Sequence, residues 1–397
     1  MRNYLKICAI LLFIPFTETI AQSDFRDGYI VSTHNDTIYG KIDYRSNAKN
    51  YESCLFMKND IITEYSPTQI VGYGFVNDKF FSSAIVEKLF VEVLVYGKIS
   101  LFRLKYNFFV RKNEGEIIEL ESNQNEVSID GKQGIVENNR WRGIISYFIS
   151  DCLSNSNQIT KILELNEKSL TKLITRYNKC TGIDFTVFKE NKPWTKFEVG
   201  ASVGLSSTFI KINNDRAQYD YLGDAYNSTD PNLGIIVAIS SPRIAEKLVV
   251  QGEIHIVNSS YSALVELNKS YQTEFHDTYI DLTTISVPVS VKYSFPEKKY
   301  SFYTQAGINY NFNIKTETKL LTETVSNNIV NTSPETIAFV INNTQIGYWG
   351  GIGLLKTFHH FKGSVNLRYF KMTSLNKTGE FTANNNRITL SIIISKK

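Results

Sequence analysis

The fold is decided by the stretch Phe197-Glu198-Val199-Gly200-Ala201-Ser202-Val203-Gly204-Leu205-Ser206. Its odd-numbered residues are apolar and its even-numbered residues are small or polar, a period of two that is typical of a β-strand with two different faces. The pattern returns at residues 285–295 and 364–369. Segments at about 232–240, 247–257, 301–314, 346–356 and 387–395 also have the composition of strands. We therefore predict eight β-strands after residue 193.

The connections between these strands alternate in length. Long connections are predicted at about 213–232, 258–278, 315–345 and 374–386, and short ones at 241–246, 296–300 and 357–360. All of the long connections then lie at one end of an antiparallel sheet and all of the short ones at the other. Bacterial outer-membrane barrels have this asymmetry, with short periplasmic turns and longer loops outside the cell. The fold class is thus mainly β, and residues 193–397 are predicted to form an eight-stranded antiparallel transmembrane β-barrel.

Alternation alone leaves open which face of the strands points outward, since a soluble lipocalin-like barrel would place the apolar side chains inside. Two features favour the membrane arrangement. The polar face is mostly Gly and Ser, which suits a narrow lumen better than a wet exterior. Aromatic pairs also gather at the short-turn end, as in an interfacial girdle. These are Trp194 and Phe197, Tyr293 and Phe295, Tyr300 and Phe302, and Phe358 and Phe361. Pro288 lies within a strand, where we expect a β-bulge.

The first residues have the pattern of an export signal. Arg2 and Lys6 precede a short apolar run, and Thr19-Ile20-Ala21 resembles a signal-peptidase site, so residues 1–21 are predicted to be a signal peptide.

The net charge of +4 is spread over intermixed acidic and basic residues, without the basic block expected of a nucleic-acid-binding protein. We expect the cell outer membrane as the location, with no nucleic-acid partner.

Residues 22–192 have a different pattern. Short strand-like runs are followed by helical spacing of apolar residues at about 141–153 and 169–179, the second ended by Gly182. This predicts a small α+β domain. An even number of barrel strands that begins on the short-turn side would place this domain in the periplasm and the long loops outside the cell.

Several short motifs resemble a known family. They are Phe197-Glu198-Val199-Gly200, Val287-Pro288-Val289-Ser290-Val291-Lys292-Tyr293, Ala306-Gly307, Gly351-Ile352-Gly353 and Leu367-Arg368-Tyr369. On these, residues 194–397 resemble the PorT-like outer-membrane β-barrel family of Gram-negative bacteria. The preceding domain is similar to uncharacterised exported domains found ahead of such barrels. Some members of that family assist protein secretion, but no residue of this chain can be assigned to that role.

Candidate chemistry is sparse. Cys152 and Cys180 each lie near the end of a predicted helix, and a disulfide between them would contribute about 3 kcal/mol to stability; three buried thiols, Cys54 included, are the alternative. Strand parity points polar side chains into the lumen, where we expect a network of paired groups. Its members are Glu198, Glu253, His255, Lys292 and Arg368.

Glu253 and His255 could also form an acid–base pair, with a nearby Ser completing a hydrolase arrangement. Paired charges that fill a narrow barrel are the simpler interpretation, so we predict no catalytic, cofactor or metal site. The expected function is non-enzymatic: anchoring, envelope organisation or assistance to secretion through the periplasmic domain. The expected partners are outer-membrane lipid and a periplasmic or envelope protein. The alternatives are an outer-membrane enzyme with its site in the barrel mouth and a soluble ligand-binding barrel.

Overall fold

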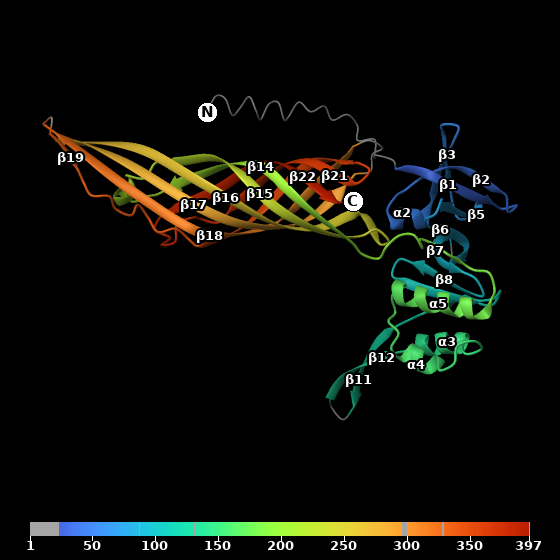
Figure 1. Cartoon of the computed structure of the whole chain (residues 1–397). Helices are drawn as coiled ribbons and strands as arrows, with labels where there is room; N and C mark the ends of the chain where they lie inside the picture. Colours follow the sequence, from blue (N-terminus) through green and yellow to red (C-terminus); the bar gives the residue numbers. More distant parts are fainter. Residues whose placement is uncertain (1–23, 87, 130–131, 296–299, 328, 397) are drawn as a thin grey trace. The chain divides into compact units, whose positions relative to one another are not determined.

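The computed structural model describes residues 24–86, 88–129, 132–295, 300–327 and 329–396 (Figure 1). The predicted signal peptide, residues 1–21, lies outside this range. The chain divides into two compact units, Met1–Pro193 and Trp194–Lys397, which are described separately below. In the part of the chain that the structure describes, no helix is both long and apolar enough to span a membrane.

The second unit is a closed ring of eight antiparallel strands, which confirms the predicted fold class. The ring consists of β14 (Lys196–Asn213), β15 (Ala225–Ser241), β16 (Ala245–Lys269), β17 (Gln272–Ser294), β18 (Ser301–Ser326), β20 (Thr344–Thr357), β21 (Phe361–Met372) and β22 (Thr382–Lys396). The last strand pairs with the first from Gly200↔Ser395 to Asn213↔Thr382, so the ring has no open seam there. A short strand, β19 (Ile329–Thr332), extends the sheet beyond β18.

At the long-connection end of the barrel, three strands are longer than predicted from the sequence. β16 and β17 continue through most of residues 258–278, which were expected to form a loop, and β18 continues to Ser326. Both faces of these extensions carry many polar residues, so the alternation that marks a half-buried strand is missing, while Thr and Val retain their preference for extended backbone.

The bulge predicted at Pro288 is also wrong. Pairing with β18 is regular there, and the register shifts between Thr283 and Thr284 instead.

The outer surface of the ring is apolar. On β14, Val203 is 51% exposed whereas its neighbour Ser202 is buried, and Val289 and Ser290 repeat this contrast on β17. Exposed aromatics flank the apolar band: Phe197 lies near one end of β14, and Phe209 lies twelve residues further along the strand. That interval is about 40 Å of strand, or about 28 Å along the membrane normal at a tilt of about 45°. It matches the apolar band of about 25 Å on outer-membrane barrels.

The first unit is built on a sheet with the strand order β10-β9-β8-β7-β6-β5-β1-β2-β3-β4, and β13 pairs with β7. The strands are β1 (Phe25–Ser32), β2 (Thr37–Asp43), β3 (Cys54–Lys58), β4 (Ile61–Tyr65), β5 (Ile70–Phe75), β6 (Phe80–Val86), β7 (Leu89–Tyr96), β8 (Ile99–Leu104), β9 (Asn107–Lys112), β10 (Ile118–Glu119) and β13 (Thr186–Val187). A separate hairpin pairs β11 (Asn123–Ile129) with β12 (Lys132–Asn138). The helices are α2 (Asn47–Glu52), α3 (Arg140–Ile149), α4 (Ser156–Lys161) and α5 (Glu167–Thr181).

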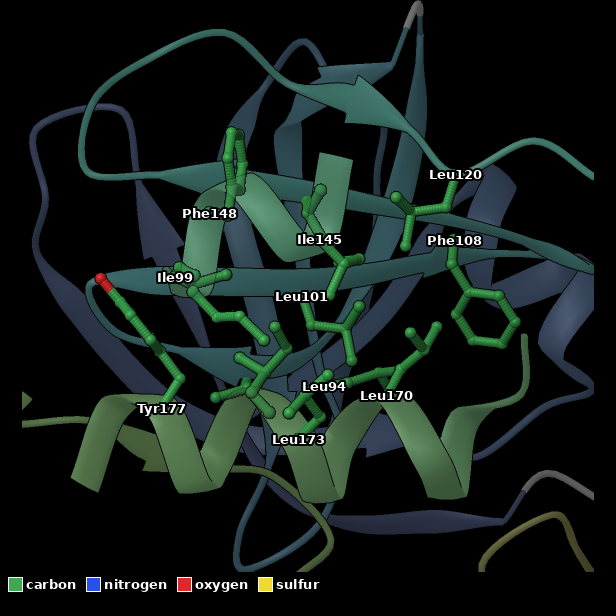
Figure 2. Close-up of a cluster of buried hydrophobic side chains, with 14 of the residues drawn as sticks. Leu94, Ile99, Leu101, Phe108, Leu120, Ile145, Phe148, Leu170, Leu173 and Tyr177 are labelled. Atoms are coloured by element: carbon green, nitrogen blue, oxygen red, sulfur yellow. The ribbon is translucent and has the colours of Figure 1, made fainter. Parts of the chain in front are cut away.

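Helices α3 and α5 cover one face of this sheet and bury its main apolar core (Figure 2). Figure 2 shows Leu170, Leu173 and Tyr177 of α5 pointing toward Leu94 and Leu101 of the sheet. The helix has defined ends. The Ser169 N–H donates to Asn166 Oδ1 at 2.8 Å at the N-cap, and Gly182 takes the left-handed conformation (φ +69°) that ends helices.

The cysteines of the first unit fall into two environments. Cys152 and Cys180 form a disulfide with a Cα–Cα distance of 6.1 Å, joining the segment after α3 to the last turn of α5. Cys54 is a buried free thiol, and burial raises its pKa to about 12.

We predict that a thiol reagent at pH 8 labels no cysteine in the native mature protein. It should label one in the unfolded, non-reduced protein and three after reduction. Three labelled thiols before reduction would contradict the disulfide.

Candidate functional site

Polar side chains fill the middle of the barrel lumen. We call this layer the polar belt; it includes Ser202, Ser206, Asn232, Glu253, His255, Ser286, Asn309, Asn366, Arg368, Arg387, Thr389 and Ser391, all buried. Hydrogen bonds join one strand to the next across the layer. Asn232 Nδ2 donates to Ser206 Oγ at 2.7 Å, and Ser206 Oγ lies 3.0 Å from Thr389 Oγ1. The hydroxyl-rich inner faces of the strands therefore meet each other, and small side chains make such close packing possible.

Glu253 is the centre of the belt. Its carboxylate is fully buried and accepts hydrogen bonds from Arg368 Nη1 at 2.7 Å and from Gln251 Nε2 at 2.7 Å. His255 Nε2 lies 2.6 Å from Glu253 Oε2, the oxygen that also accepts the hydrogen bond from Arg368. The Arg368 guanidinium also lies over the Trp349 ring, 4.9 Å from its centroid. A buried charge is tolerated only when it is paired and hydrogen-bonded, and Glu253 has both kinds of partner.

Ser202, His255 and Glu253 form a line that resembles a hydrolase triad. Ser202 Oγ lies 3.4 Å from His255 Nδ1, and the opposite ring nitrogen contacts Glu253. None of the three lines the cavity at the barrel mouth. The site is also crowded, because a Cβ on Gly234 would lie 2.3 Å from His255 Nδ1. A nucleophile needs space for a reacting carbonyl within about 3 Å, so this geometry supports lumen packing rather than catalysis.

The short-turn mouth of the barrel holds the remaining predicted lumenal charges. Glu198 pairs with Lys362 Nζ at 2.5 Å and with Lys196 Nζ at 3.1 Å. Lys292 Nζ donates to Gln251 Oε1 at 3.1 Å and so contacts the belt. These residues line a cavity of about 310 Å³. The structure thus brings Glu253, His255 and Arg368 together but leaves Glu198 in a separate ion-pair group at the mouth.

An apolar plug closes the lumen at the long-connection end. It combines inward residues of the strands with residues of the connections: Ile210, Ile212, Leu222, Tyr226, Tyr261, Ile280, Leu282, Ala338, Phe339, Ile341, Leu375, Phe381 and Ala383. A cavity of about 20 Å³ borders Tyr261 and Arg387, room for about one water. The plug was not predicted from the sequence, since its loop residues follow no period. The only sequence signal is that inward positions of β14 change from Ser to Ile after Thr208.

A ring of four charges in the first unit was also missed. The Lys189 ammonium lies 2.6 Å from Glu92 Oε1 and 2.9 Å from Glu167 Oε1, and Arg103 pairs with both carboxylates. We call Glu92, Arg103, Glu167 and Lys189 the charge ring. Burial opposes ionisation of Glu92, but the neighbouring Lys189 and Arg103 outweigh it and lower its pKa to about 2. A sequence signal existed, because Glu92 interrupts the otherwise apolar strand Leu89–Tyr96.

The charge ring joins elements that are far apart in sequence. Glu92 lies on β7, Arg103 on β8 and Glu167 at the start of α5, while Lys189 follows β13 on the segment that leads to the barrel. All four side chains are at least mostly buried. The ring therefore fixes the end of the first unit to its sheet. In the described part of the chain, no group of three or more His, Cys, Asp or Glu side chains is placed to hold a metal ion.

Comparison with known proteins identifies the class of the second unit. Residues 188–378 match the family model for an outer membrane protein beta-barrel domain. The C-terminal half of the chain is accordingly an outer-membrane β-barrel domain, as predicted. No curated protein matches the sequence.

Similar solved structures include small outer-membrane proteins. Neisserial surface protein A is 12% identical, with a TM-score of 0.28, over 50% of this chain and 97% of that one. OprG from Pseudomonas aeruginosa is 13% identical, with a TM-score of 0.27, over 52% and 94%. Ail, the attachment invasion locus protein of Yersinia pestis, is 13% identical, with a TM-score of 0.23, over 50% and 99%. Likenesses this distant carry no information about function.

Proposed function

We propose that this protein, whose C-terminal half is an outer-membrane barrel domain, is a non-enzymatic anchor that holds its N-terminal domain at the periplasmic face of the outer membrane. The observation that carries the proposal is the filled lumen. The polar belt occupies mid-height, the apolar plug closes the long-connection end, and the mouth cavity of about 310 Å³ lies at the short-turn end. A barrel that conducted solutes would need a continuous polar passage.

The topology supports a periplasmic N-terminal domain. β14 begins at Lys196, which pairs with Ser240, next to the tight turn between β15 and β16. The first unit therefore precedes the barrel on its short-turn side, which faces the periplasm in outer-membrane barrels. There the domain would bind a periplasmic or envelope protein, in an envelope-organising or secretion-accessory role. The PorT-like resemblance of residues 194–397 is consistent with this proposal.

The two alternatives have less support. A site in the barrel mouth would have to use the mouth cavity, whose polar groups Glu198 and Lys362 are already paired with each other. A soluble barrel would have to expose the apolar band, including Val203 and Val289, to water. Contiguous exposed apolar surface of that kind marks contact with lipid or another protein.

The filled lumen predicts that the protein does not conduct. The full chain, reconstituted in a planar lipid bilayer, should give no stable current steps above the lipid leak in salt solution. A porin inserted in the same bilayer is the positive control. Reproducible steps of constant size from the pure protein would show an open passage and would contradict the anchor proposal in favour of a channel.

A further inference from the structure

The sheet of the first unit has a second face that the helices do not cover. Side chains alternate between the two faces along each strand. Leu101 packs toward α5 and its neighbour Phe102 points to the opposite side, and Leu94 and Val93 show the same division on β7. On this opposite side the sheet carries a cleft of about 470 Å³, within the size range of small-molecule sites.

Aromatic rings form the walls of this cleft. The ring of Phe80 stacks on that of Tyr29 at a centroid distance of 6.2 Å and on that of Phe188 at 5.4 Å. Val93 and Phe102 contribute to the lining from the neighbouring strands. The result is an apolar surface with stacked rings, which suits a hydrocarbon chain better than a polar ligand.

One cation lies in the same cleft. Arg111 of β9 lines it, and the guanidinium carbon lies 5.7 Å from the centroid of the Phe102 ring. Arg111 Nε is buried and has no hydrogen-bond partner among the described residues. Arg103 and Lys189, two enclosed cations elsewhere in this unit, have carboxylate partners. A buried donor without an acceptor is costly, and an anionic ligand group would satisfy it.

We propose that this cleft binds a single-chain amphiphile with an anionic head, a long-chain fatty acid. The hydrocarbon chain lies along Tyr29, Phe80 and Phe188, and the carboxylate accepts hydrogen bonds from Arg111. Charge-assisted hydrogen bonds of this kind are about twice as strong as neutral ones and give the site its preference for an acid over an alcohol. The inference is independent of the anchor function, because it rests only on the first unit.

Photo-crosslinking tests the proposal on the full chain. The protein is reconstituted in lipid nanodiscs, equilibrated with a subsaturating amount of palmitate that carries a terminal diazirine, irradiated, digested and analysed by mass spectrometry. We expect label on the peptides that contain Phe80, Val93 or Phe188. Unlabelled palmitate should compete for this labelling, whereas hexadecanol should compete at least about tenfold less well, since the alcohol lacks the charge.

Two variants separate the parts of the site. Arg111→Gln should reduce labelling of the cleft at least about tenfold, while Arg176→Gln, on the exposed side of α5, should leave it unchanged. Val71→Trp keeps the cation but fills the cleft, and should abolish labelling there. Thermal melting of each variant checks that it is folded. Label confined to the barrel exterior, or cleft labelling that is equal in wild type and Arg111→Gln, would overturn the proposal.

Discussion

Glu92→Gln should lower the free energy of unfolding of the N-terminal domain by about 3–5 kcal/mol, the usual cost of removing one partner from a buried ion pair. The substitution leaves Glu167 as the one remaining carboxylate of the charge ring beside the enclosed cations Lys189 and Arg103. Because the charge ring joins β7, β8, α5 and the segment after β13, its loss should loosen all four elements together. Denaturant unfolding of the full chain, followed by a probe in the first unit, measures the effect.

The matched control is Glu114→Gln, which removes the same charge from an exposed position and should change stability by less than about 0.5 kcal/mol. Acid titration gives a second test. The pKa of Glu92 is lower in the folded protein, about 2, than its ordinary value of 4.5, so its contribution is complete above about pH 4.5 and is lost as the pH falls toward 2. Glu92→Gln should remove that part of the acid sensitivity. Equal stability of the two variants would contradict the importance of the ring.

Val203→Arg should weaken folding of the barrel into lipid by about 2–4 kcal/mol, because an arginine at the bilayer midplane of an outer-membrane barrel has that cost. Val203 is suited to the test, since it lies midway between the exposed aromatics Phe197 and Phe209 on β14. The measurement is the equilibrium folding of purified protein into lipid vesicles over a denaturant series.

Asn343→Arg introduces the same side chain at an exposed position outside the apolar band and should leave folding unchanged. Val289→Arg, on β17, three strands along the ring from β14, should repeat the loss seen with Val203→Arg. If arginine were tolerated at both valines, the apolar band would not face lipid, and the facing of every strand would have to be revised.

The barrel could be predicted from sequence because the side chains on its two faces differ in polarity along the strands. Val203 beside Ser202, or Val289 beside Ser290, carries the facing information locally, and no knowledge of distant residues is needed. The strand ends could not be predicted in the same way. Where β18 continues through Thr318 and Thr322 it lacks an apolar face, so the alternation ends long before the strand does.

The features that fill and close the molecule depend on contacts between distant residues. Phe339 and Leu375 of the plug lie in connections with no regular period, and only the closed ring brings them over Ile210. Glu92 and Lys189 are likewise far apart in sequence. The inward direction of Glu253 and Arg368 followed from strand parity, but their direct contact depends on the register around the ring, which the sequence does not specify.

The most direct test of the central claim is fractionation of the cell that produces the protein. The full chain should sediment with the outer membrane, dissolve only in detergent, and migrate differently on gels before and after heating, as a folded barrel does. A chain that ends after Pro193 should appear instead in the soluble periplasmic fraction. Recovery of the full chain in the soluble fraction, with no change of mobility on heating, would contradict a membrane-spanning barrel.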